Sequence, residues 1–154
     1  MLLNSYYNFV PLLAINVMGR ILAIDYGQKR VGIAVTDSLQ LIANGLTTVS
    51  SDTIFAFISA YIDKETVDKI IVGLPKQMNN EASESMRFIA PFVTALQKKH
   101  PTIPVLMVDE RFTSKLAQQT MLASGISKKK RQDKALVDQI SATILLQSYL
   151  ESIR

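Results

Sequence analysis

Two short apolar runs joined by a glycine-containing turn, over residues 21–35, constrain the fold of this chain more than any other feature. The first run, residues 21–24, has the continuous apolar character of a strand that is buried on both faces. The chain turns after Gly27 and returns through the second apolar run, residues 31–35. The pattern predicts a β-hairpin with one carboxylate, Asp25, at the exit of its first strand.

Asp25 has two interpretations from its local sequence. A charge at the end of a buried strand is costly unless a cation meets it, which favours a functional carboxylate. Aspartate is also common in turns, where it accepts backbone N–H bonds, and many turns share the Asp-x-Gly spacing. The hairpin alone leaves both interpretations open.

Composition limits the class of protein. A chain of 154 residues with 48% hydrophobic content can form one domain with a proper core. The absence of cysteine excludes thiol catalysis, zinc–thiolate sites and disulfides, and is consistent with a reducing cytoplasm. A net charge of +4 and a pI near 9.4 favour an anionic partner such as nucleic acid.

Residues 1–17 contain no charged side chain, and asparagine and proline interrupt their apolar residues. They fit neither a membrane-spanning helix, which needs about 20 apolar residues, nor a signal peptide, so no membrane association is expected. One interpretation places the true start at Met18, with a single domain over residues 18–154. The other is an additional helix or strand packed on the domain edge.

Strand and helix patterns alternate after the hairpin. A β-prone run at residues 46–49 predicts a third strand, and apolar residues at helical spacing predict a helix over residues 52–63. A buried strand is expected at residues 69–75. Because a strand–helix–strand crossover is right-handed, this strand should lie parallel to the first.

A second helix is expected over residues 82–100, with Pro91 kinking it or dividing it into two. His100, the one histidine, follows as a cap at the polar C-terminal end of this helix rather than as a ligand. Another buried strand is predicted at residues 104–108.

Two consecutive acids, Asp109 and Glu110, follow that strand. Side chains alternate along a strand, so the two should point to opposite sides, and only one can join a site at the strand ends. Thr113 or Ser114 can cap the next helix, which should end before Gly125.

A final helix is predicted over residues 133–152, and Asp138 flanks its apolar stripe. An unpaired carboxylate there would be desolvated, so Asp138 is either a functional acid or the partner of Lys134 at i−4. The basic run Lys128–Arg131 before this helix is either a solvated loop or a contact for phosphate backbone. The predicted stripe consists of Val137, Ile140, Ser141, Ile144, Leu145 and Ser148.

Several motifs occur together in a specific order. They are GRILAIDYG at residues 19–27, KRVGIAVTD at 29–37, IVGLP at 71–75, DERFTS at 109–114, and VD at 137–138 with ILLQSYL at 144–150. Together they resemble the YqgF (RuvX) family of pre-16S ribosomal RNA nucleases, also described as Holliday junction resolvase-like. The resemblance covers residues 18–151.

The resemblance implies an α/β, ribonuclease-H-like fold, with a five-stranded mixed sheet flanked by helices. It also implies a divalent-metal nuclease whose metal-binding and catalytic acids are Asp25, Glu110 and Asp138, which selects Glu110 over Asp109. Mg²⁺ or Mn²⁺ suits such oxygen ligands, and two ions can activate a water and stabilise the leaving oxygen. Asp25 is the expected bridging ligand.

Candidate substrate-binding residues flank these acids. Arg30 and Arg111 can hold the substrate phosphate, and the helix N-terminus at Ser114 is another candidate anion-binding site. A structural ion pair with a neighbouring acid is the alternative for either arginine. The basic run contributes Lys128, Lys129, Lys130 and Arg131.

Three functions remain open on the sequence. The first is a cytoplasmic, metal-dependent nuclease that processes ribosomal RNA precursor. The second is a DNA junction nuclease, which would favour a homodimer over a monomer because symmetric cutting needs two sites. The third is a non-catalytic nucleic-acid-binding module.

Overall fold

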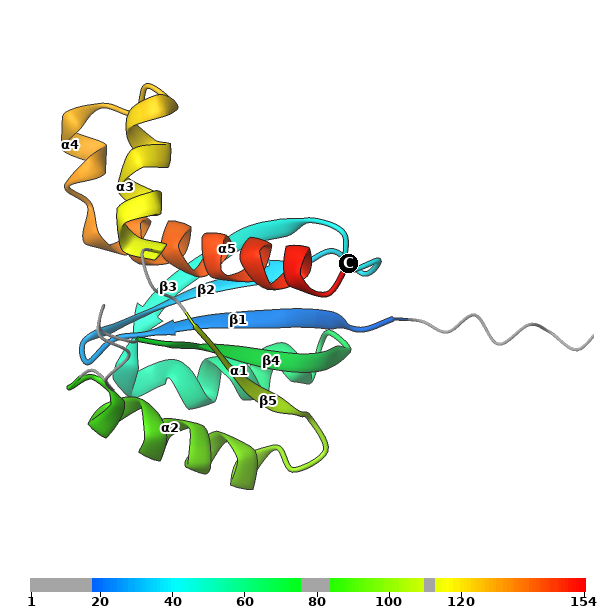
Figure 1. Cartoon of the computed structure of the whole chain (residues 1–154). Coiled ribbons are helices and arrows are strands. Elements are labelled where there is room, and N and C mark those ends of the chain that lie inside the picture. The colour runs from blue at the N-terminus through cyan, green and yellow to red at the C-terminus, as the bar shows by residue number, and fades with distance from the viewer. Residues whose placement is uncertain (1–17, 76–83, 110–112) are drawn as a thin grey trace, which may run out of the picture.

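The computed structural model describes residues 18–75, 84–109 and 113–154, which form one sheet with helices on both faces (Figure 1). The expectations about residues 1–17, Glu110 and Arg111 concern positions outside these described residues.

The sheet has five strands in the order β3-β2-β1-β4-β5. Strands β1 (Arg20–Tyr26), β2 (Arg30–Thr36) and β3 (Ala43–Ser50) form an antiparallel meander. Strands β4 (Val67–Leu74) and β5 (Val105–Asp109) add to the other side of β1 in parallel. The hairpin, the third strand and the parallel placement of β4 agree with the sequence analysis, and the sheet is mixed as expected.

Helices cover both faces of the sheet. The short 3₁₀ helix η1 (Ser51–Thr53) and α1 (Ile54–Ile62) connect β3 to β4, and α1 lies with α2 (Met86–Lys99) on one face (Figure 1). Helix α5 (Lys134–Ser152) covers the opposite face. Strand alternation divides the core between the two faces. In β1, Leu22 and Ile24 pack toward α1 and α2, while Ile21 and Ala23 pack toward α5.

Helix α2 is a single helix with Pro91 in its second turn, so of the two alternatives, a kink or a division into two helices, the division is wrong. Proline has no backbone N–H, so Pro91 removes one helical bond, the one to the carbonyl of Arg87. His100 ends α2 by donating its backbone N–H to Leu96 O at 3.0 Å, as the sequence analysis predicted. Its Nε2 also lies 3.3 Å from the hydroxyl of Ser59 on α1.

Strand β5 is the edge of the sheet and is not the buried strand that the sequence predicted. Leu106 is 40% exposed and Met107 is 48% exposed, although they point to opposite faces. The physical reason is position, because β5 is the edge strand and has a neighbouring strand on one side only.

Helix α5 buries a different stripe from the predicted one. Val137, Ile140 and Ile144 are only half-buried, and Ser148 is exposed. The helix is contacted by the sheet on one side and by α3 (Thr113–Ala123) on another, so its apolar residues are spread around it. Asp138 lies at the N-terminal end of the stripe that is buried, which consists of Ser141, Ala142, Leu145, Leu146, Tyr149 and Leu150.

Helices α3 and α4 (Lys128–Arg131) project from the body of the domain beside the start of α5 (Figure 1). Helix α3 contacts α5, and its residues Ala117 and Met121 are buried. Helix α3 ends before Gly125, as predicted, and Gly125 has a φ of +70°, which glycine adopts readily. The basic run forms one helical turn capped by Ser127, so the alternative of a solvated loop is wrong about the loop, although its lysines are exposed.

Within the described residues, no helix has the length and apolar character needed to cross a membrane.

Candidate active site

Asp25 lies near the C-terminal end of β1, the central strand of the sheet. Ile21 and Ala23 of the same strand pack against α5, so alternation places Asp25 on the α5 face as well. Directly opposite Asp25 in the antiparallel pair is Gly32 of β2. The Cα atoms of such opposed residues are about 5 Å apart.

Gly32 brings the second predicted acid to the same place. A Cβ built on Gly32 would overlap the backbone carbonyl of Asp138, which shows that α5 crosses the sheet here with no side chain between helix and strand. Both acids therefore adjoin Gly32. Asp25 lies opposite it on β1, and the backbone of Asp138 lies over it on α5. The sequence analysis gave Gly32 no role, although the register of the hairpin would have paired it with Asp25.

Arg30 joins this group as the ion-pair partner of Asp138. Its Nε donates to Asp138 Oδ2 at 2.9 Å, and the two side chains are 38% and 26% exposed. The interpretation that Lys134 pairs with Asp138 is thus replaced by a pair between β2 and α5. Of the two roles expected for Arg30, the structure shows the ion pair with a neighbouring acid.

The turn between β1 and β2 fixes the position of Arg30 at the start of β2. The backbone N–H of Gly27 donates to Arg30 O at 3.0 Å and closes the hairpin. A Cβ on Gly27 would lie 2.6 Å from that carbonyl oxygen, so a larger residue would push the strand start away. The glycine of the Asp-x-Gly pattern therefore positions Arg30 and, through it, the Asp138 carboxylate.

Asp109 is placed away from this group by strand register. Val108 packs into the α5 cluster, and its neighbour Asp109 therefore belongs to the α1–α2 face. The preference for Glu110 over Asp109 stays a prediction, because Glu110 lies outside the described residues together with Arg111 and the side chain of Ser114. Among the described residues, no group of three or more acidic or histidine side chains is placed to bind a metal.

The basic run lies next in the chain to the helix that carries Asp138. Lys128, Lys129 and Lys130 are exposed on α4. Arg131 is half-buried, and its Nη1 donates to Ile126 O at 2.7 Å, so it also holds the turn before α4. Asp133 then caps α5 by accepting from Ala135 N at 3.0 Å.

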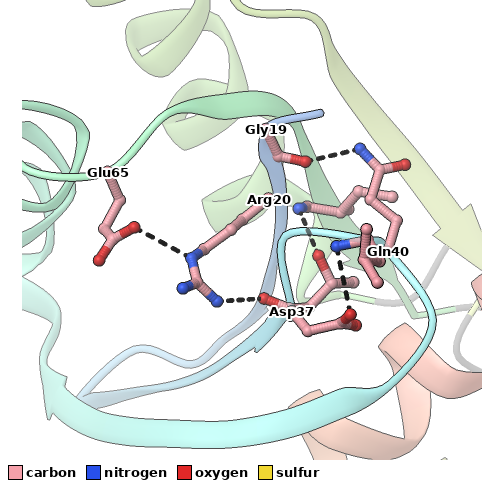
Figure 2. Close-up of polar contacts among 8 residues, drawn as sticks. Gly19, Arg20, Asp37, Gln40 and Glu65 are labelled. Atoms are coloured by element: carbon pink, nitrogen blue, oxygen red, sulfur yellow. Dashed lines mark hydrogen bonds and ion pairs between the residues drawn. The ribbon is translucent and has the colours of Figure 1, made fainter. Parts of the chain in front are cut away.

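The opposite end of β1 carries a polar network that the sequence analysis did not anticipate (Figure 2). Arg20 Nε donates to Glu65 Oε2 at 3.1 Å, and its Nη1 donates to Thr36 O at 2.8 Å. The backbone N–H of Ile42 and two neighbouring N–H groups hold the pKa of Asp37 below its ordinary value of 3.8. These contacts join β1, β2 and the following turn, and they lie away from Asp25.

A mixed five-stranded sheet in the order β3-β2-β1-β4-β5 with helices on both faces is the ribonuclease-H-like fold. Two solved structures share this fold with a TM-score of 0.53 and 15% identity. Fowlpox virus resolvase with Holliday junction DNA aligns over 87% of this chain and 98% of its own. T. thermophilus RuvC with a Holliday junction substrate aligns over 88% and 96%.

The sequence comparisons give the family. The model of the RuvX family, described as Holliday junction resolvase, matches residues 19–152. A relative from Bacteroides thetaiotaomicron is 66% identical over 137 residues, which cover 89% of this chain and 99% of the relative. One from Phocaeicola vulgatus is 67% identical over 135 residues, covering 88% and 97%. Both are named as candidate pre-16S rRNA nucleases. The chain belongs to the RuvX family.

Proposed function

We propose that this protein is a cytoplasmic, divalent-metal-dependent endonuclease that acts in the 5′ maturation of pre-16S ribosomal RNA. The observation that carries the proposal is that Asp25 lies opposite Gly32 on β2 while the backbone of Asp138 lies over the same glycine. The names of the relatives from Bacteroides thetaiotaomicron and Phocaeicola vulgatus support the RNA substrate.

The proposed ligands of the metal are Asp25, Glu110 and Asp138, and Mg²⁺ or Mn²⁺ fits their donor set. All three offer carboxylate oxygens, which these hard cations prefer, and Asp25 and Asp138 come from different elements that converge. When bound, such ions supply an activated water and stabilise the leaving oxygen of the phosphodiester. Asp25, near the end of the central strand, would hold the metal together with Asp138 and Glu110.

The proposed substrate contacts are cationic. Lys128, Lys129 and Lys130 present three exposed ammonium groups on one turn, beside the helix that carries Asp138. Charges of this kind bind nucleic acid through its phosphates and in a salt-dependent way. Arg111, Arg131 and the helix N-terminus at Ser114 are proposed to extend this phosphate-binding surface.

A DNA junction nuclease is the second candidate, since the fold is shared with two resolvases and the family model carries that description. Symmetric cutting of a four-way junction needs two active sites, so this function requires a homodimer, whereas RNA trimming can be done by a monomer. Light scattering of the protein with and without a synthetic junction distinguishes the two assemblies.

The decisive experiment compares a 5′-extended ribosomal RNA precursor fragment with a four-way DNA junction, each with Mg²⁺, Mn²⁺ or chelator. Wild type, Asp25→Asn and the control Asp63→Asn, which alters an exposed acid at the end of α1, are assayed together. Metal-dependent cleavage of RNA by wild type and the control, absent in Asp25→Asn, is expected. Cleavage of the junction alone would replace the proposal by the second candidate, and binding without cleavage would indicate a non-catalytic module.

A further inference from the structure

Two arginine–carboxylate pairs lie at opposite ends of β1. Arg20 pairs with Glu65 near the strand start, and Arg30 pairs with Asp138 near its end. In both pairs the arginine donates through Nε, at 3.1 Å and 2.9 Å, and the side chains are similarly exposed. Arg30 lies opposite Gly27 in the hairpin, seven residues along from Arg20, so the two sites are about 23 Å apart at about 3.3 Å per residue. Of these two pairs, the second uses an acid whose backbone lies over Gly32, the residue opposite Asp25.

The Arg30–Asp138 pair places a permanent positive charge where a metal ligand is proposed. Asp138 is only 26% exposed, and it adjoins Gly32, which lies opposite Asp25. Both acids flank the same glycine, and neighbouring carboxylates disfavour each other's charged form unless a cation is present. The guanidinium of Arg30 supplies a cation to Asp138, from the start of the strand that also holds Gly32.

We propose that Arg30 is the internal counter-ion of this carboxylate site and competes with a divalent cation for Asp138. The inference rests on the proposed function, because it takes Asp25 and Asp138 as metal ligands. The guanidinium occupies Asp138 Oδ2, and its charge opposes the approach of a second cation to the same carboxylate. In this proposal, a divalent ion that binds Asp138 weakens the Arg30–Asp138 pair.

A purely orienting role for Arg30 has the opposite consequence. A residue that only holds a ligand in position strengthens metal binding, and its loss weakens the affinity, typically by 10–100-fold. Loss of a competing charge strengthens the affinity instead. The sign of the change on substitution therefore separates the two roles.

The first test measures Mn²⁺ binding directly, from the free-ion signal in electron paramagnetic resonance, with no nucleic acid present. Arg30→Gln is expected to bind Mn²⁺ about tenfold more tightly than wild type, because it removes a nearby positive charge. Arg30→Lys keeps the charge and should stay near wild type. Arg20→Gln is the matched control, since it breaks the equivalent pair at the other end of β1, and should leave the affinity unchanged.

The outcomes separate the inference from the function on which it rests. Weaker or unchanged binding by Arg30→Gln would overturn the role of Arg30 alone. Absence of Mn²⁺ binding in both wild type and Arg30→Gln would overturn the metal site itself, and the inference with it.

A second test uses the wild-type protein and so does not depend on the folding of a variant. The Nε–H of Arg30 donates to Asp138, and its nuclear magnetic resonance signal and hydrogen exchange report on that bond. Saturation with Mg²⁺ should shift this signal and accelerate its exchange, while the Nε–H of Arg20 stays unchanged. An Arg30 Nε–H that remains equally protected at saturating Mg²⁺ would contradict the proposal.

Discussion

Gly32 of β2 lies directly against the backbone carbonyl of Asp138 on α5. The contact fixes the height of the helix over the sheet at the point where β1 ends. It follows that the smallest side chain is required there, because any Cβ would overlap main-chain atoms of the helix.

We expect Gly32→Ala to destabilise the protein by about 1–3 kcal/mol, the usual cost of overpacking, and to displace Asp138 from Asp25. Gly45→Ala is the control at the same sheet–helix interface, where the nearest atom to a new Cβ is Gln139 Nε2 at 2.7 Å, on a flexible side chain. Urea unfolding of both variants tests this expectation. Equal destabilisation by the two substitutions would show that the backbone contact is not special.

Substitution of the proposed acids should remove cleavage without unfolding the domain. Asp25→Asn, Glu110→Gln and Asp138→Asn are each expected to reduce cleavage by more than about a hundredfold, since loss of outer-shell partners alone costs 10–100-fold. Cleavage assays with circular dichroism on the same samples provide the measurement. A fully active Asp138→Asn would reduce Asp138 to the structural partner of Arg30.

The three exposed lysines of α4 should carry part of the affinity for nucleic acid. Replacing Lys128, Lys129 and Lys130 by glutamine is expected to weaken RNA binding. The slope of log K against log salt should become shallower by about 2, since each contact with a single strand contributes about 0.7. Arg131 is left in place because it bonds to Ile126 O. The control replaces Lys98 and Lys99, exposed in the last turn of α2. An unchanged salt slope in the α4 variant would exclude these contacts.

Asp37 should make stability depend on pH in the acidic range. Its pKa is below the ordinary value of 3.8 in the folded protein, chiefly because Ile42 N–H donates to it. The folded state therefore binds the proton less readily than the unfolded chain. The stabilisation is present above pH 3.8 and is lost as the pH falls through the lower, folded-state pKa.

The free energy of unfolding of wild type and Asp37→Asn, measured at pH 7 and near pH 3, tests this linkage. The variant should be less stable at pH 7, and the difference should shrink at the lower pH. A difference that is the same at both pH values would mean that the charge of Asp37 contributes nothing.

We also propose that the functional domain starts at Met18. Gly19 N donates to Asp68 Oδ2 at 2.8 Å and Arg20 pairs with Glu65, so the start of β1 has its own anchors. Deletion of residues 1–17 should therefore leave the thermal midpoint and cleavage unchanged. A lower midpoint would favour a segment packed on the domain edge, and an intact mass from the native host that includes these residues would contradict a start at Met18.

The sequence by itself determined the features that depend on residues close together in the chain. The apolar runs around Gly27 specified the hairpin and put Asp25 at the strand exit, because strand formation and turn geometry act over a few residues. The handedness of crossovers then placed β4 parallel to β1. The family motifs selected the acids, but no spacing rule could have shown how Asp25 and Asp138 meet.

Only the tertiary structure decided which of several equivalent local patterns is used. Helix α5 is apolar on more than one side, so periodicity could not select the stripe that faces the sheet and brings Asp138 to Gly32. An apolar run fits a central strand and an edge strand equally, and only the strand order exposes Leu106. Arg30 and Asp138 are 108 residues apart in sequence. Their pairing follows from the packing of α5 across β2, because contacts between distant segments are set by the whole core and not by either segment alone.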